Sequence, residues 1–160
     1  YKRQHSDGSS AKSLVETGRK NMGSKLNVTA AEIIITSGRT EADNLAIHSG
    51  VRDLGVERII TTSIEHHAVI YIVDHCAEKY GTEVVHVKLK ECGTPNYIDL
   101  EQLLSSSDKK PLVSLMHINN EIGNKLDMDR VGALCKKYKA LFHSDCVQYI
   151  GHYDMDFGKL

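Results

Sequence analysis

Short runs of β-branched residues alternate along the chain with stretches of helical spacing, and this alternation limits the possible folds most strongly. The predicted strands cover residues 32–36, 58–62, 83–87, 111–116 and 140–144. The predicted helices cover residues 10–22, 40–51, 67–80, 99–104 and 127–138, with Asp99 as the cap of the fourth. Five strands separated by helices predict a doubly wound α/β layer with a mainly parallel sheet and helices on both faces.

The composition suits a single globular domain: 160 residues, of which 41% are hydrophobic and 26% charged. A formal net charge of −1 gives no electrostatic reason to expect nucleic acid or an anionic membrane as a partner. The apolar runs are too short to span a bilayer, and no signal sequence opens the chain. Four cysteines without a Cys-x-x-Cys motif predict no metal site. We therefore expect a cytoplasmic protein.

The candidate chemistry lies on loops that follow four of the predicted strands, because ligands bind at the carboxyl ends of parallel strands. The first loop, residues 36–41, combines a strand end, a glycine turn and a helix start. Free N–H groups at a helix N-terminus, together with the hydroxyl of Thr40, form an anion site. An ordinary capped helix, with Ser37 or Thr40 as N-cap, is the alternative.

The second and third loops carry polar groups, which are unfavourable in such a loop unless they form hydrogen bonds with a ligand or with the backbone. His66 and His67 suit metal ligation, a catalytic base or stacking on an aromatic ligand, and surface or cap histidines are the alternative. Asn119, Asn120 and Glu121 lie between apolar segments, where turn-forming asparagines are the alternative.

The fourth loop begins where the apolar run at residues 140–144 ends in Asp145, with Gln148 three residues later. A carboxylate at the end of a buried strand must have a partner, since an unpaired buried charge is costly. The alternative is a helix N-cap aspartate whose first-turn glutamine imitates a capping box.

Together and in this order, these loops resemble the cysteine desulfurase and selenocysteine lyase family, which are class V aminotransferase-fold enzymes that use pyridoxal 5′-phosphate (PLP). The matching stretches are residues 36–46, 65–69, 117–123 and 143–148. In addition, His5-Ser6-Asp7-Gly8 is similar to the end of the family's Asn-Pro-Ser-Ser-x-His segment. The resemblance implies the large domain of a fold type I (aspartate aminotransferase-like) PLP-dependent transferase, incomplete in this chain.

The resemblance implies that the cofactor phosphate binds at the first loop. The amide of Arg39 and the side chain of Thr40 would hold it at the helix N-terminus. The family has Gly or Ala where this chain has Arg39, so we expect the arginine side chain to turn outward or to meet the phosphate.

The other implied contacts surround the pyridine ring of the cofactor. His66 would stack on the ring and is the catalytic residue expected in this chain, while Asn120 would lie beside the ring. Gln148 would bind the phenolic oxygen. Asp145 would pair with the protonated ring nitrogen, which lets the ring accept electrons from a carbanion.

The activity implied by the resemblance is that of a PLP-dependent cysteine desulfurase. Such an enzyme converts L-cysteine to alanine and leaves an enzyme persulfide for iron–sulfur cluster assembly or another sulfur-transfer pathway. We expect a homodimer and a sulfur-acceptor protein as partner.

Residues 1–160 would form part of one PLP-binding large domain, with residues 1–8 an incomplete N-terminal segment. The C-terminal part of that domain and the small domain would be absent. The Schiff-base lysine and the persulfide cysteine would also lie outside the chain, so we expect the chain alone to be inactive and poorly stable.

Two alternative functions remain open at this point. One is another class V PLP enzyme, such as a selenocysteine lyase, an aminotransferase or a decarboxylase. The other is a non-catalytic nucleotide-binding α/β module that uses residues 37–40, although no Gly-x-Gly-x-x-Gly or Gly-Lys-Ser/Thr motif accompanies that turn.

Overall fold

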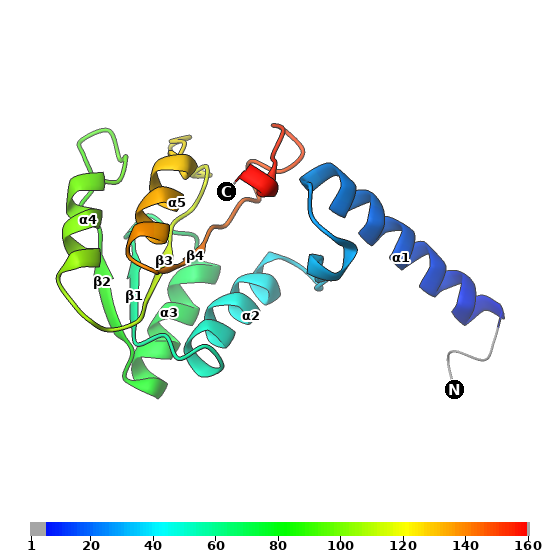
Figure 1. Cartoon of the computed structure of the whole chain (residues 1–160), viewed down its shortest axis with the longest axis horizontal. Helices are drawn as coiled ribbons and strands as arrows, with labels where there is room; N and C mark the ends of the chain where they lie inside the picture. Colours follow the sequence, from blue (N-terminus) through cyan, green and yellow to red (C-terminus); the bar gives the residue numbers. More distant parts are fainter. Residues whose placement is uncertain (1–5, 160) are drawn as a thin grey trace. The chain divides into compact units, whose positions relative to one another are not determined.

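The computed structural model describes residues 6–159 and divides into two compact units (Figure 1). The first unit combines the described parts of residues 1–36 and 153–160, and the second is Ser37–His152. Every candidate site residue belongs to the second unit. The expectation that residues 1–160 form part of one domain stays a prediction.

A four-stranded parallel sheet lies at the centre of the second unit, in the order β2-β1-β3-β4. Its strands are β1 (Arg58–Thr61), β2 (Glu83–His86), β3 (Pro111–Ser114) and β4 (Leu141–His143). Ile59 of β1 pairs with Val84 on one side and with Leu112 on the other, and Val113 of β3 pairs with Phe142. Because β2 and β3 flank β1, the winding direction reverses beside β1, where open α/β sheets bind ligands.

Helices cover both faces of this sheet (Figure 1). They are α2 (Arg39–Arg52), α3 (His67–Tyr80), α4 (Tyr97–Ser105) and α5 (Met128–Lys137). Neighbouring strand residues point to opposite faces, so Ile59 packs in a core with Val69 of α3, and Ile60 in a core with Val131 of α5. The predicted doubly wound α/β architecture is confirmed.

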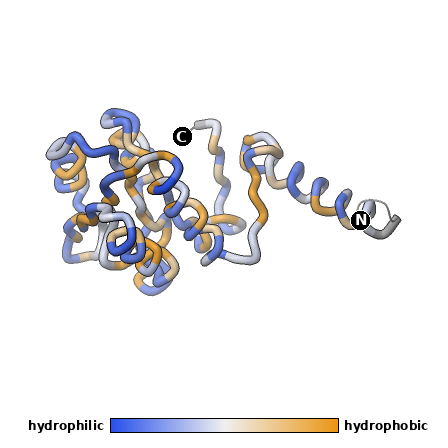
Figure 2. Tube along the Cα trace, turned by 90° about the horizontal axis from the view of Figure 1, so that it is seen from below, coloured by the Kyte–Doolittle hydropathy of each residue, from blue (hydrophilic) through white to orange (hydrophobic). Residues whose placement is uncertain are grey.

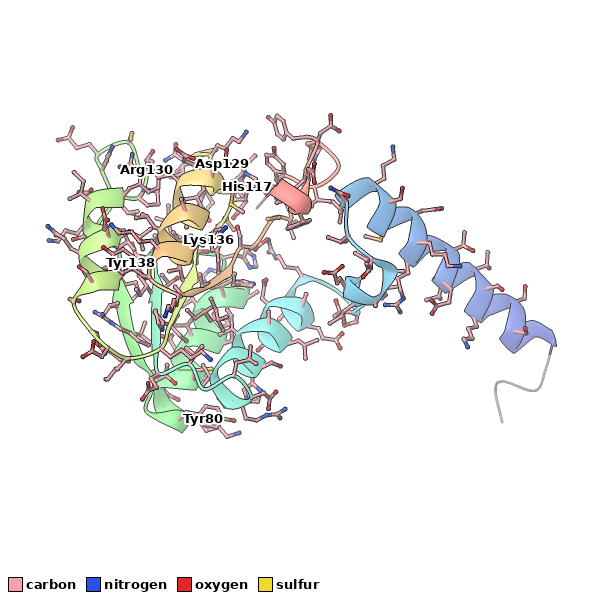
Figure 3. The ribbon with its side chains drawn as sticks, in the orientation of Figure 1. Tyr80, His117, Asp129, Arg130, Lys136 and Tyr138 are labelled. Atoms are coloured by element: carbon pink, nitrogen blue, oxygen red, sulfur yellow. The ribbon has the colours of Figure 1, made fainter. Side chains whose placement is uncertain are left out.

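The buried residues of α5 have the spacing that predicts an amphipathic helix from the sequence. Val131 and Cys135, four residues apart, are buried, whereas Asp129, Arg130 and Lys136 are exposed on the same helix (Figure 3). The helix connects β3 to β4 and so fixes the segment that leads to Asp145.

The predicted cap of α4 is wrong. The helix begins at Tyr97, and the side chain of Asn96 accepts the N–H groups of Ile98 and Asp99. Asp99 instead lies in the first turn, where its carboxylate accepts the N–H of Lys88 at 2.8 Å. Asn96 serves as the cap because it directly precedes the helix and its oxygen reaches two of the free N–H groups of the first turn.

The strand predicted at residues 32–36 is also wrong. Glu32 ends the 3-10 helix η1 (Ala30–Glu32), where its carboxylate accepts the N–H and the hydroxyl of Thr29 at 2.7 Å each. The next residues pair with no strand of the described structure, and Ile34 and Ile35 are 70% and 52% exposed. Figure 2 shows this hydrophobic stretch in orange before α2. A β-branched run forms a strand only where another strand supplies hydrogen-bond partners.

The rest of the first unit is a long helix with a short C-terminal segment. The helix predicted at residues 10–22 lies within α1 (Ser6–Leu26), and the C-terminal segment ends in the 3-10 helix η2 (Phe157–Lys159). Asn27 follows α1 in the left-handed region, with φ of 56°, and its amide donates to Asp156 at 2.8 Å. His5, part of the N-terminal similarity, lies outside the described residues.

Candidate functional site

Polar side chains gather at the C-terminal edge of the sheet in the second unit. His66 follows β1, His117 follows β3 (Figure 3) and Asp145 follows β4, while α2 begins beside them at Arg39. The loops after β3 and β4 are joined by the backbone, because the N–H of His117 donates to the carbonyl of Asp145 at 3.0 Å. The predicted convergence of loops at this edge is therefore present in the structure.

Asp145 is buried, and only one of its carboxylate oxygens has a hydrogen-bond partner. Oδ1 accepts the N–H of Val147 at 3.0 Å in a turn, and no described helix begins there, so the helix-cap alternative fails. Oδ2 has no hydrogen-bond partner, and Arg39 Nη1 lies 3.6 Å from it. A buried carboxylate with an open acceptor favours a cation beside it.

Arg39 supplies that cation. Its guanidinium contacts both Asp145 and Nε2 of His66, although the three residues belong to three different elements. The arginine side chain is 23% exposed, whereas that of Asp145 is 1% exposed. The side chain therefore does not turn outward, as one of the two predictions had it, because the buried carboxylate attracts it inward; its contact with a phosphate stays a prediction.

His66 is the N-cap of α3, so the cap alternative for this residue is confirmed. Its Nδ1 accepts the N–H of Ala68 at 3.1 Å, and its Nε2 faces the guanidinium of Arg39. A neutral imidazole has one acceptor nitrogen, and a guanidinium only donates, so one of these two N–H donors lacks an acceptor. His67 is exposed and stacks on Tyr71, with ring centroids 5.6 Å apart.

A carboxylate of the protein itself lies at the N-terminus of α2. Gly38 is the N-cap, and the carboxylate of Glu41 accepts both the N–H and the hydroxyl of Ser37 at 2.6 Å. These two hydrogen bonds lower the pKa of Glu41. Thr40 is exposed in the first turn, where backbone N–H groups have no partner within the helix. The geometry suits an anion.

The two asparagines of the third loop differ in their surroundings. Asn119 is buried; it donates to the carbonyl of Ile64 at 2.7 Å and accepts the N–H groups of Glu121 and Ile122. The turn-forming alternative is therefore confirmed for Asn119. Asn120 is exposed, as is Gln148 in the turn after Asp145. The cofactor contacts predicted for Asn120 and Gln148 stay predictions.

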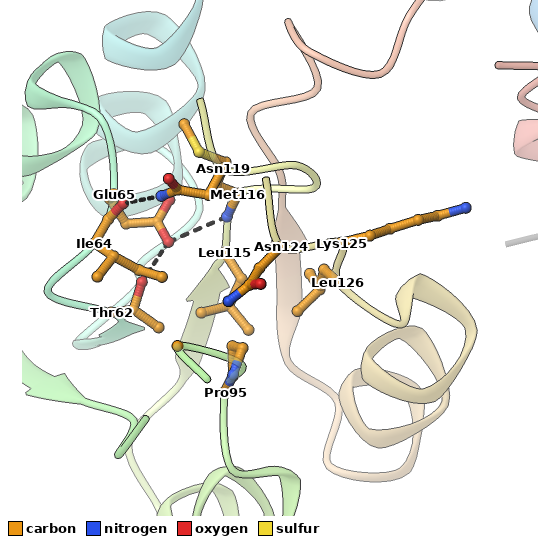
Figure 4. Close-up of a pocket in the computed structure, with 11 residues that line it drawn as sticks. Thr62, Ile64, Glu65, Pro95, Leu115, Met116, Asn119, Asn124, Lys125 and Leu126 are labelled. Atoms are coloured by element: carbon orange, nitrogen blue, oxygen red, sulfur yellow. Dashed lines mark hydrogen bonds between the residues drawn. The ribbon is translucent and has the colours of Figure 1, made fainter. Parts of the chain in front are cut away.

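Glu65 lies outside the residues predicted for the site, yet it joins the second and third loops (Figure 4). Its Oε1 accepts the hydroxyl of Thr62 at 2.6 Å and the N–H of Met116 at 3.1 Å, while its Oε2 is buried without a hydrogen-bond partner. Burial raises its pKa to about 7, against the effect of these two hydrogen bonds. A cavity of about 20 Å³, also lined by Asn119 and Leu126, lies beside it.

A second buried polar chain ties α2 to the sheet. Nε2 of His143, on β4, lies 3.4 Å from Asp43, and its Nδ1 lies 2.9 Å from the hydroxyl of Ser114 on β3. Asp43 is one helical turn before the buried Ile47, so a polar residue on the inward face of the predicted helix was the available signal. These contacts help to place the start of α2 next to Asp145.

Comparison with known sequences assigns the fold and the loops to a family. The sequence model of the family "Aminotransferase class-V" matches residues 1–160, the whole chain. The chain belongs to the class V aminotransferase family.

Curated relatives of this class V chain include two named cysteine desulfurases. One is the mitosomal cysteine desulfurase of Trachipleistophora hominis, 38% identical over 100% of this chain and 36% of the relative. The other is an IscS-like cysteine desulfurase of Mycobacterium tuberculosis, 35% identical over 96% of this chain and 40% of the relative. The chain thus spans well under half the length of these relatives.

Solved structures agree with the fold. A NifS-like protein from Rickettsia africae has a TM-score of 0.85 and 31% identity, and covers 98% of this chain and 42% of its own. Another NifS-like protein has a TM-score of 0.87 and 32% identity over 98% of this chain and 43% of its own. The resemblance predicted from the four loops is confirmed.

The class V chain carries a thiol directly after Asp145 that is unsuited to nucleophilic chemistry. Cys146 lies 3.8 Å from Nδ1 of His117, whose ring stacks on Tyr149 at 3.7 Å between centroids. Burial raises the pKa of the Cys146 thiol and lowers the pKa of His117, so both groups favour their neutral forms. This environment therefore disfavours the thiolate of Cys146.

Thiol labelling is expected to separate Cys146 from Cys92. Cys92 is exposed, and its hydrogen bonds with Thr94 lower its pKa, so it should react with iodoacetamide first. Mass spectrometry after timed labelling of the native protein checks this order. The Cys92→Ala variant should lose the fast phase and Cys146→Ala should retain it; the reverse result would contradict the assignment.

Among residues 6–159, no group of three or more His, Cys, Asp or Glu side chains is placed to hold a metal ion. No described helix is both long and apolar enough to cross a membrane.

Proposed function

We propose that this chain contributes the PLP-binding edge of a cysteine desulfurase. The observation that carries the proposal is Asp145, whose buried Oδ2 accepts no hydrogen bond and faces a guanidinium that also contacts His66. Relatives of 35% and 38% identity that are named cysteine desulfurases support it. The cysteine desulfurase activity is proposed for the whole protein, because the chain spans only 36–40% of the length of these relatives.

The residues of the site fit the cofactor, because side chains of the protein already imitate its two charged ends. The planar guanidinium of Arg39 contacts His66 and Asp145, which would hold the flat pyridinium ring. The carboxylate of Glu41 accepts two donors of Ser37 at the start of α2, where a phosphate would bind.

Asp145 would favour a proton on the ring nitrogen, because its buried carboxylate gains a cation as neighbour. PLP supplies an electron sink for the substrate carbanion when its ring nitrogen is protonated. His66 would orient the ring with its imidazole face, and its own position is fixed by the N–H of Ala68. Gln148 and Asn120 are exposed and free of the core, which suits contacts with the cofactor.

At the other end of the site, Thr40 and the amide of Arg39 would bind the phosphate at the first turn of α2. Glu65 would keep the loops of His66 and Asn120 together through Thr62 and the N–H of Met116. The protein would thus orient the cofactor through elements that are packed independently of it.

The remaining parts of the function belong to the same proposal. The substrate would be L-cysteine, and the products alanine and a persulfide whose sulfur passes to an acceptor protein, for example in iron–sulfur cluster assembly. We further propose a homodimer, and residues 1–160 as part of one PLP-binding large domain. The cytoplasmic location stays a prediction.

The test uses the protein expressed from its complete reading frame. We expect a visible absorbance band after addition of PLP, and release of alanine and sulfide from L-cysteine in the presence of a thiol reductant. A keto acid product without sulfide would instead favour an aminotransferase. Absence of the PLP band, combined with thermal stabilisation by nucleotides, would contradict the proposal.

A further inference from the structure

The guanidinium of Arg39 lies between the two groups that the proposed function gives to the cofactor ring. Nη1 is 3.6 Å from Oδ2 of Asp145, and Nη2 contacts Nε2 of His66. The family resemblance gives only the backbone amide of this residue a role, so the position of the side chain is a feature of this chain. It places a cation on the only open acceptor of Asp145.

The guanidinium of Arg39 occupies the space beside that acceptor. Oδ1 of Asp145 is engaged by the N–H of Val147 at 3.0 Å, and Oδ2 is fully buried. A ring held between His66 and Asp145 would need the position that the guanidinium now occupies, so the ring and the guanidinium would compete for the space beside Oδ2. Both partners are planar cations, so each satisfies the same need of the buried carboxylate.

The contact with His66 holds Arg39 less firmly than the contact with Asp145. Because Nδ1 of His66 accepts the N–H of Ala68, a neutral His66 presents an N–H at Nε2, which faces a second donor on Arg39. The arginine side chain is also partly exposed, so it has a route into solvent. Arg39 can therefore move away from Asp145 when another cation binds to this carboxylate.

We propose that Arg39 is an exchangeable counter-ion that neutralises Asp145 in the cofactor-free protein and must withdraw before the PLP ring binds. This inference rests on the proposed function. It makes Arg39 a positioning residue that sets the threshold for cofactor loading, because the apparent dissociation constant rises as the fraction of molecules with an open site falls.

The experiment compares the complete protein with its Arg39→Ala and Arg39→Gln variants, each freed of cofactor. The PLP dissociation constant is measured by fluorescence titration, and thermal unfolding is followed with and without PLP. Arg52→Ala is the matched control, because Arg52 lies in the last turn of the same helix and pairs with Asp53 at the surface.

We expect both Arg39 variants to bind PLP about tenfold more tightly than the wild type. The cofactor-free variants should unfold at a lower temperature, since Asp145 loses its cation, and the loaded variants should not show this loss. Arg52→Ala should match the wild type in both measurements. A merely structural arginine would lower both unfolding temperatures equally.

Unchanged or weaker PLP binding in both Arg39 variants, with a wild type that binds PLP, would overturn the exchange and leave the proposed function in place. Absence of PLP binding in the wild type and in all variants would overturn both. Binding by the Arg39 variants alone would support the exchange in its strongest form.

Discussion

Asp145→Asn is expected to lower kcat/KM for sulfide release from L-cysteine by about 100-fold or more in the complete protein, by analogy with other removed charge-stabilising groups. An amide has nearly the shape of the carboxylate and can still accept the N–H of Val147, so the turn should survive. It carries no negative charge, however, and cannot favour a proton on the ring nitrogen. Steady-state kinetics with saturating PLP, together with the visible spectrum, measure this loss.

Asp99→Asn is the matched control for this change. Asp99 is also a buried aspartate that accepts a backbone N–H, from Lys88 at 2.8 Å, but it lies on α4, outside the site. Its variant should keep kcat/KM within about threefold of the wild type, although its stability is expected to fall by about 1 kcal/mol. Equal losses in the two variants would show that Asp145 acts through the fold and not through the cofactor.

The strands of the second unit could be predicted from the sequence because each of them has a neighbour. β1 is buried along its whole length, and its apolar residues match the run at residues 58–62. The similar run at residues 32–36 carries the same local signal but lacks a pairing partner among the described residues, and so forms no strand. Local propensity shows that a segment favours the extended backbone of a strand, but it does not show whether another strand lies beside that segment.

The candidate site shows the same division. Asp145 was identifiable because it directly follows a buried strand, and its burial is confirmed. Its partner Arg39 lies near the start of the second unit in sequence, whereas Asp145 lies near its end. Glu65, which follows β1, accepts the N–H of Met116, which follows the neighbouring strand β3. Such contacts follow from the order of strands in the sheet, which a single sequence does not state.

Glu65→Gln is expected to remove a pH dependence of stability that the wild type has between about pH 4.5 and 7. The pKa of Glu65 is about 7 in the folded protein and 4.5 without the fold, so the folded state binds more protons within this interval. The stability from Glu65 is therefore fully present below pH 4.5 and is lost as the pH rises through 7. The loss amounts to about 3 kcal/mol.

Glutamine imitates the protonated acid: its oxygen can accept from Thr62 and from the N–H of Met116, and it carries no charge. The free energy of unfolding of Glu65→Gln should thus exceed that of the wild type above pH 7 and approach it near pH 4.5. Urea unfolding at a series of pH values gives this difference, in which other titrating groups such as His117 cancel.

Glu83→Gln provides a control of opposite sign. Lys109 lowers the pKa of Glu83, so the stability from this group is present above pH 4.5 and lost as the pH falls. Above pH 7 the two variants should therefore differ from the wild type in opposite directions, Glu65→Gln being more stable and Glu83→Gln less stable, and both should approach the wild type at low pH. A Glu65→Gln variant that is less stable than the wild type at pH 8 would show that the charged carboxylate, and not the neutral one, joins the loops of His66 and Asn120.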